Sequence, residues 1–68
     1  MKGLKENQYI VFNRDILYGS RVLFKKGDVG KITMYDGGDW IIVNSIGFPL
    51  TNKVMRVATI DEIRMWLL

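Results

Sequence analysis

Turn signals interrupt every apolar run of this 68-residue chain and limit each extended segment to a few residues. The segments KKGD (residues 25–28) and DGGD (residues 36–39) contain glycine, which adopts the positive φ angles that tight turns require. Between these two turns the side chains alternate, with Ile32 and Met34 expected on one face and Tyr35 on the other. Short alternating segments between glycine turns favour an all-β fold.

Five short segments rich in β-branched and aromatic residues are predicted to form strands: residues 9–12, 22–24, 29–35, 40–44 and 53–57. Residues 13–21 are polar and contain Gly19, which predicts a long loop. A further turn is expected at residues 45–47, and Pro49 indicates an edge or irregular segment. Five close strands indicate a small antiparallel barrel over about residues 8–57. Its predicted core is Ile10, Val22, Phe24, Val29, Ile32, Ile41, Val43 and Val54, with Ile63 and Leu67 from the chain's end.

The last ten residues change from a strand pattern to a helical one. Thr59 is followed three residues later by Glu62, the spacing of a capping box, which predicts a short C-terminal helix over about residues 60–67. At 100° per residue one apolar stripe forms along this helix, and we expect it to pack on the barrel. The stripe consists of Ile60, Ile63, Trp66 and Leu67. Met65 and Leu68 lie off it and are candidates for contact with a partner or with a second copy of the chain.

Composition sets the class of protein. Apolar residues make up 49% and charged residues 25% of the chain, which favours one globular domain over residues 1–68. Cysteine and histidine are both absent, which removes thiol nucleophiles, imidazole bases and the usual zinc ligands. We therefore expect no enzyme, no metal site and no cofactor. The apolar runs are too short to span a membrane, and residues 1–8 lack the core of a signal peptide, so we expect a cytoplasmic protein without a membrane partner.

The order of these segments resembles that of an SH3 domain. IVFNR (residues 10–14) stands where the family has its ALYDY-like first strand, and VLFKKGD (residues 22–28) follows it. GDWI (residues 38–41) takes the place of the tryptophan pair, and GFPLTNKV (residues 47–54) resembles the last motif. The resemblance covers about residues 9–57. It implies an SH3-like, five-stranded antiparallel barrel, an architecture shared with KOW-type barrels.

The departures from the family bear on ligand choice. SH3 domains that bind proline-rich peptides use two tyrosines in the first motif, an acidic loop, a tryptophan, a proline and a last tyrosine. The tyrosine positions of the first motif hold Phe12 and Arg14 here, and Leu50 and Lys53 replace the proline and the last tyrosine. Trp40 matches the tryptophan. A proline helix needs a row of aromatic slots, so a proline-peptide groove is not expected, and the basic loop suits an acidic ligand better.

Trp40 is the strongest candidate for a contact residue. If Ile41 and Val43 point into the barrel, strand alternation places Trp40 and Ile42 on its outer face. Tryptophan frequently anchors protein interfaces. The alternative, of equal weight on the sequence alone, is that the C-terminal helix or the long loop covers the indole. The predicted protein-binding residues are Phe12, Tyr18, Arg21, Trp40 and Ile42.

Basic residues are concentrated in the first part of the chain, where residues 1–31 carry seven Lys or Arg against three acids. Lys25, Lys26 and Lys31 form, with Arg21, a candidate basic patch, although turn lysines are most often only solvated. We expect a non-catalytic binding module or regulator, such as the stand-alone adaptors and inhibitors that phages and mobile elements encode. Its expected partner is a protein with an acidic or mixed surface, and the chain itself is a monomer or a weak homodimer. The alternative is a nucleic-acid-binding barrel of KOW type, in which exposed aromatics would stack on bases.

Overall fold

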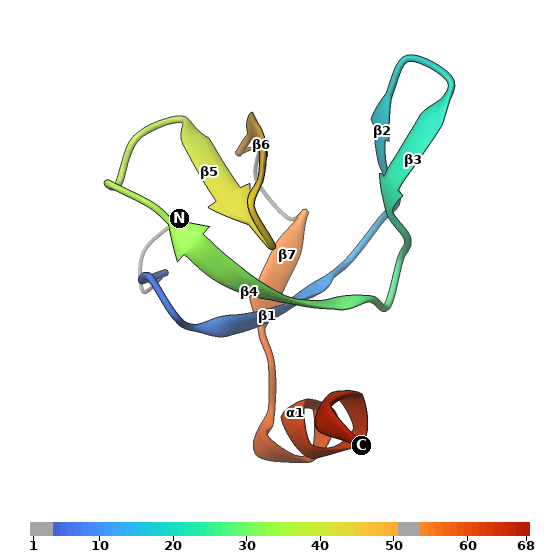
Figure 1. Ribbon diagram of the computed structural model, residues 1–68, viewed down its shortest axis with the longest axis vertical. Helices are drawn as coiled ribbons and strands as arrows, with labels where there is room; N and C mark the ends of the chain where they lie inside the picture. The colour runs from blue at the N-terminus through green and yellow to red at the C-terminus, as the bar shows by residue number, and fades with distance from the viewer. Residues whose placement is uncertain (1–3, 51–53) are drawn as a thin grey trace.

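The computed structural model describes residues 4–50 and 54–68, which contain seven strands and one helix. In chain order they are β1 (Tyr9–Phe12), β2 (Ile16–Tyr18), β3 (Arg21–Phe24), β4 (Val29–Met34), β5 (Trp40–Val43), β6 (Ile46–Pro49), β7 (Met55–Val57) and α1 (Ile60–Leu67). Five strands form one antiparallel sheet in the order β6-β5-β4-β1-β7, and β2 pairs with β3 in a separate hairpin (Figure 1). The mostly β class, the five-stranded antiparallel sheet and the short C-terminal helix are confirmed.

The five strands of the sheet are not the five that the sequence predicts. Residues 22–24 belong to β3, whose partner β2 lies within residues 13–21, so the predicted long loop is wrong and is instead half of a hairpin. The remaining strand of the sheet is β6, an edge strand that ends at Pro49, where a missing N–H costs no ladder bond. Within residues 4–50 and 54–68, β6 and β7 are the two edges, and no pairing between them closes a barrel.

Three phenylalanines from three different elements form the centre of the core. The rings of Phe12 in β1 and Phe24 in β3 are stacked with their centroids 4.3 Å apart. The ring centroid of Phe48 in β6 lies 5.9 Å from that of Phe12 and 5.8 Å from that of Phe24. Aromatic pairs at these separations add to the stabilisation from area burial. The cluster holds the base of the hairpin and the edge strand β6 against the middle of the sheet.

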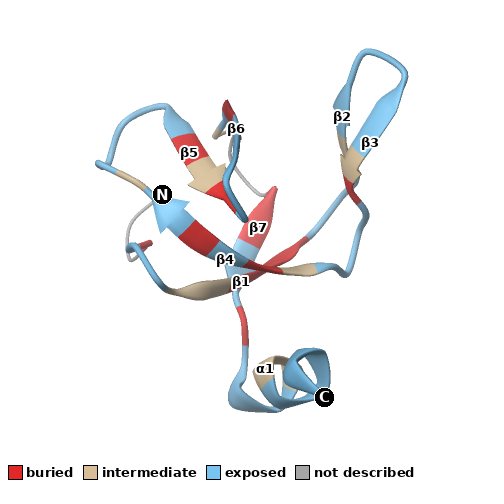
Figure 2. Cartoon of the chain, viewed as in Figure 1, coloured by how far each residue is buried: buried red, intermediate tan, exposed pale blue. Residues whose placement is uncertain are grey.

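The predicted core is confirmed at six positions, which are buried: Ile10, Phe24, Ile32, Ile41, Val43 and Val54. Val22 is exposed, because β3 belongs to a hairpin that projects from the sheet (Figure 2). Leu67 is also exposed, and no other residue of α1 is buried. The prediction omitted Phe12, Phe48 and Met55, which are among the most buried side chains.

A β-bulge in β4 changes which of its side chains face outward. Ile32 pairs with Val43, but Met34 pairs with Ile42, so β4 advances two residues while β5 advances one. The predicted alternation therefore fails beyond Ile32. Met34, expected on the side of Ile32, is exposed, and Tyr35 packs against the core instead.

The turn between β5 and β6 is a two-residue loop. Asn44 and Ser45 have φ angles of 50° and 67°, and positive φ at both central residues is the signature of a type I′ hairpin turn. Two bonds to β4 support it: the Lys31 N–H donates to Asn44 Oδ1 at 2.9 Å, and the Ser45 N–H donates to Thr33 Oγ1 at 2.9 Å. The turn begins one residue earlier than predicted, which leaves Gly47 inside β6.

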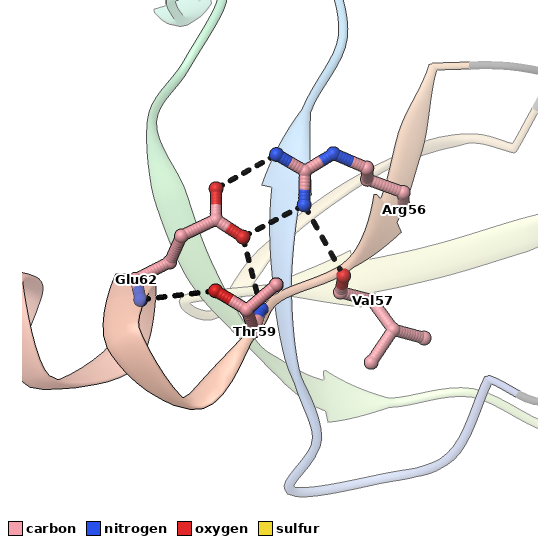
Figure 3. A network of polar contacts seen from close by, with 4 residues as sticks. All are labelled: Arg56, Val57, Thr59 and Glu62. Carbon is pink, nitrogen blue, oxygen red and sulfur yellow. Dashed lines mark hydrogen bonds and ion pairs between the residues drawn. The ribbon is translucent and has the colours of Figure 1, made fainter.

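Polar contacts anchor helix α1 (Figure 3). The predicted capping box is confirmed: the Glu62 N–H donates to Thr59 Oγ1 at 3.2 Å, and the Thr59 N–H donates to Glu62 Oε1 at 2.9 Å. Arg56 of β7 donates two bonds of 2.7 Å to the same carboxylate. The Arg56 guanidinium, and after it the Thr59 N–H, lower the pKa of Glu62 to about 2, while the pairing raises the pKa of Arg56. The first turn of the helix is therefore tied to the last strand of the sheet.

Candidate functional site

An apolar surface covers the outer side of β4, β5 and β6. Met34 pairs with Ile42, and Ile42 pairs in turn with Gly47, so these three residues share a face across the three strands. Trp40 pairs with Pro49 on the same face. Residues directly opposite each other in an antiparallel pair point to the same side of the sheet. We call Met34, Trp40, Ile42, Gly47 and Pro49 the outer apolar face.

The indole of Trp40 lies open to solvent and is braced on one side only. Its residue is 55% exposed, and Met34 is exposed to the same extent, so the predicted outward direction of Trp40 is confirmed. Helix α1 lies below β1 and β4 in Figure 1, away from the start of β5. A Cβ atom at Gly47 would come within 2.8 Å of Trp40 Nε1 and 3.5 Å of Cε2. The ring therefore lies across Gly47, whose lack of a side chain makes this approach possible.

The charges nearest the outer apolar face are negative. A small groove of about 100 Å³ runs between Trp40, Ile42, Met34, Tyr35 and Asp36. Asp36 Oδ1 accepts a bond from the Gly38 N–H at 2.9 Å, which fixes this carboxylate beside the groove, and Asp39 directly precedes Trp40. The sequence predicts basic neighbours for Trp40. The structure instead places the Asp36 carboxylate beside this groove.

The other predicted contact residues do not join Trp40. Phe12 is 1% exposed, so its place in the predicted protein-binding surface is wrong: its ring fills the core between Phe24 and Phe48. Tyr18 and Arg21 are paired with each other at the tip of the β2–β3 hairpin, and both are exposed. In Figure 1 this hairpin and the start of β5 occupy opposite sides of the molecule. Of the predicted set, only Trp40 and the half-buried Ile42 form one surface.

The turn role of the KKGD segment is confirmed. The Lys25 N–H donates to Asp28 Oδ2 at 2.9 Å, and the Asp28 N–H donates to the Lys25 carbonyl at 2.9 Å. Gly27 has φ of +90°, which disfavours other residues. The Lys26 N–H donates to Asp15 Oδ1 at 2.7 Å and so joins the turn to the segment before β2.

The candidate basic patch is not assembled. Arg21 and the two turn lysines lie at opposite ends of β3, roughly 13 Å apart along a four-residue strand. Lys31 belongs to β4, and its Nζ lies 5.7 Å from the ring centroid of Tyr9, an attractive cation–π geometry. Tyr9 also contacts Trp66 of α1 with a centroid separation of 5.7 Å. Tyr9 therefore helps to place the helix on the sheet, with Lys31 beside its ring.

A second, larger hollow lies between α1 and the β3–β4 turn, with a volume of about 680 Å³. Met65, predicted as a dimer or partner contact, lines it and is 72% exposed, while Leu68 is fully exposed at the end of the helix. Its lining residues are Phe24, Gly27, Asp28, Val29, Asn44, Asp61, Glu62, Met65 and Trp66. Sequence reasoning missed this groove, because its walls come from segments more than thirty residues apart and no local pattern joins them.

Comparison with known protein families, curated proteins and solved structures finds no match to this chain. In the part of the chain that the structure describes, no helix is both long enough and apolar enough to cross a membrane.

Proposed function

We propose that this chain is a non-catalytic binding module that docks on a partner protein through its outer apolar face. The observation that carries this proposal is the half-exposed indole of Trp40, braced on Gly47 and flanked by the exposed Met34. Tryptophan and methionine are enriched at the centres of protein interfaces, and a ring that is already positioned loses little conformational entropy on binding. An apolar surface of this kind on a small domain marks an interaction site.

The partner surface that fits this face is apolar at its centre and basic at its rim. Asp36 lines the groove beside Trp40 and Asp39 precedes Trp40 in the chain, and neither has an ion-pair partner in the described residues. Complementary charges at an interface speed association and exclude partners of the wrong sign. The proposal thus differs from the acidic or mixed partner surface expected from the sequence, because the proposed partner surface is basic at its rim.

We further infer that the chain has the SH3-like architecture that its motifs imply. The strand order β6-β5-β4-β1-β7, with a projecting hairpin between the first strand and the KKGD turn, supports this assignment. Trp40 occupies the position of the family's tryptophan at the start of β5. A proline-peptide groove is not part of the proposal, because Phe12 is buried where the family exposes an aromatic slot.

The test compares partner capture by single variants of the full chain. Wild-type protein, Trp40→Ala and Met34→Lys are immobilised and incubated with nuclease-treated lysate of the native host, and the bound proteins are identified by mass spectrometry. Leu17→Ala, an apolar truncation at an exposed position of β2, is the matched control, and circular dichroism verifies that each variant is folded. We expect a protein that wild type and Leu17→Ala retain and that both face variants lose. Equal capture by all four proteins would contradict the proposal, and capture seen only in a parallel lysate without nuclease would favour nucleic acid.

A further inference from the structure

The groove between α1 and the β3–β4 turn is acidic in a chain that is basic overall. Its charged lining residues are Asp28, Asp61 and Glu62, and no lysine or arginine lines it, although the chain carries a net charge of +3. Its apolar walls are formed by side chains from β3, β4 and α1, including Met65 and the half-exposed Trp66. The hollow combines two carboxylates that have no ion-pair partner in the described residues, Asp28 and Asp61, with an aromatic wall.

The three carboxylates are not equivalent. Both oxygens of Glu62 are occupied by Arg56, and one also accepts the Thr59 N–H. Asp28 uses Oδ2 for the Lys25 N–H and keeps Oδ1. Asp61 has no hydrogen-bond or ion-pair partner anywhere in residues 4–50 and 54–68. A carboxylate accepts about four hydrogen bonds, so Asp61 and Asp28 both have capacity for a cationic ligand.

We propose that this groove binds an arginine side chain presented by an extended segment of a partner protein. A guanidinium offers planar donors that suit a carboxylate such as Asp61, and its face stacks on an aromatic ring such as Trp66. The methylene groups of the same side chain lie favourably along an apolar wall, which Met65 provides. A lysine carries a compact, strongly hydrated charge and uses the aromatic wall less well. The site lies apart from the outer apolar face and does not depend on it.

The experiment titrates the ¹⁵N-labelled full chain with a capped five-residue peptide that has a central arginine between leucines. The control peptide carries citrulline, which has nearly the same shape without the charge. Asp61→Asn and Asp28→Asn remove charge from the groove and retain an oxygen acceptor, so the Lys25 N–H keeps its partner. Asp36→Asn is the matched control, because it removes the same charge beside the outer apolar face. A dispersed amide spectrum verifies that each variant is folded.

We expect the arginine peptide to shift amides of the β3–β4 turn and α1, and the citrulline peptide to shift none of them. Asp61→Asn should raise Kd by roughly fivefold, while Asp36→Asn and Trp40→Ala leave it unchanged. Equal binding of the two peptides, shifts confined to β5 and β6, or no shift at millimolar peptide would overturn the proposal. So would sedimentation equilibrium showing a dimer that the peptide dissociates, because a second copy of the chain would then be the occupant. Loss of partner capture by Trp40→Ala with intact peptide binding separates this site from the proposed function.

Discussion

Two glycines inside strands, Gly30 in β4 and Gly47 in β6, should respond in opposite ways to substitution by alanine. Both have φ outside the left-handed region, so alanine fits the backbone at each position. Both also have a side chain within 3 Å of the position of an added Cβ. They differ in what that neighbour can do, because Val43 faces the core and Trp40 faces solvent.

Gly30→Ala places its Cβ 2.5 Å from Val43 Cγ1, whereas carbon atoms pack best at about 3.5–4.0 Å. The neighbour must move by about 1 Å, but Val43 is fully buried, and Phe12 Cε2 lies 3.5 Å from the same Cβ. Overpacking of this kind costs about 1–3 kcal/mol. Alanine also lowers the conformational entropy of the unfolded chain, which stabilises the folded state by about 0.4–1 kcal/mol. We expect a net loss of about 1–2 kcal/mol in the free energy of unfolding, or roughly 4–16 °C in Tm.

Gly47→Ala meets Trp40 Nε1 at 2.8 Å, but this atom belongs to a ring that is half exposed and can rotate toward solvent. The lost contact between ring and strand is offset by the same gain of about 0.4–1 kcal/mol from the unfolded chain. We expect stability within about 0.5 kcal/mol of the wild type. The displaced indole should nevertheless weaken partner capture, because the outer apolar face loses its brace.

Urea denaturation followed by circular dichroism measures both effects, against a total stability of roughly 3–10 kcal/mol for a domain of this size. In a Trp66→Phe background, fluorescence reports Trp40 alone, and Gly47→Ala should increase its quenching by iodide. Similar losses of stability in the two alanine variants would refute the assignment of Gly30 to the core side and Gly47 to the open side. An unchanged Trp40 signal in Gly47→Ala would refute the bracing contact.

Three further predictions test the core, the helix anchor and the β5–β6 turn. Phe12→Ala should lower the free energy of unfolding by about 3–5 kcal/mol, a large part of the total, and wild-type stability in urea would show that the ring is not a core residue. The Glu62–Arg56 pair, with the Glu62 pKa lowered to about 2, should stabilise the fold fully above the ordinary carboxyl pKa and progressively less as pH falls toward 2. Glu62→Gln should remove the fall in Tm that loss of the Glu62–Arg56 pair causes at low pH. Curves of Tm against pH that run parallel for wild type and Glu62→Gln would contradict this prediction. Asn44→Ala should cost about 1–2 kcal/mol, because alanine disfavours positive φ and loses the bond from the Lys31 N–H, while Asn44→Gly should cost less.

Local signals in the sequence were sufficient for the KKGD turn, the edge position of Pro49 and the helix start. The Thr59–Glu62 box and the glycine of KKGD act within four residues, so their geometry follows from their spacing. The outward direction of Trp40 also follows from strand alternation, because no bulge interrupts β5. These features need no knowledge of the rest of the fold.

The features that the sequence did not predict all depend on contacts between segments that are distant in the chain. Phe12 is buried because Phe24 of β3 stacks on its ring and Phe48 of β6 packs against it at a tilt, and nothing near Phe12 in the sequence indicates this. The bulge between Ile32 and Met34 depends on the register with β5, so the alternation of β4 alone predicts the wrong face for Met34. The acidic groove joins the β3–β4 turn to α1 and exists only in the folded chain.

Helix α1 buries no residue and is held by the bond from Arg56 to Glu62 and by the contact of Trp66 with Tyr9. Its amide hydrogens should therefore exchange with solvent deuterium through detachment of the helix alone, well before those of β1 and β4. Detachment also removes one wall of the acidic groove, so a bound cation and a docked helix stabilise each other. An occupant at one hundred times its Kd should slow exchange in α1 by about a hundredfold and leave the sheet amides that exchange by separate openings unchanged.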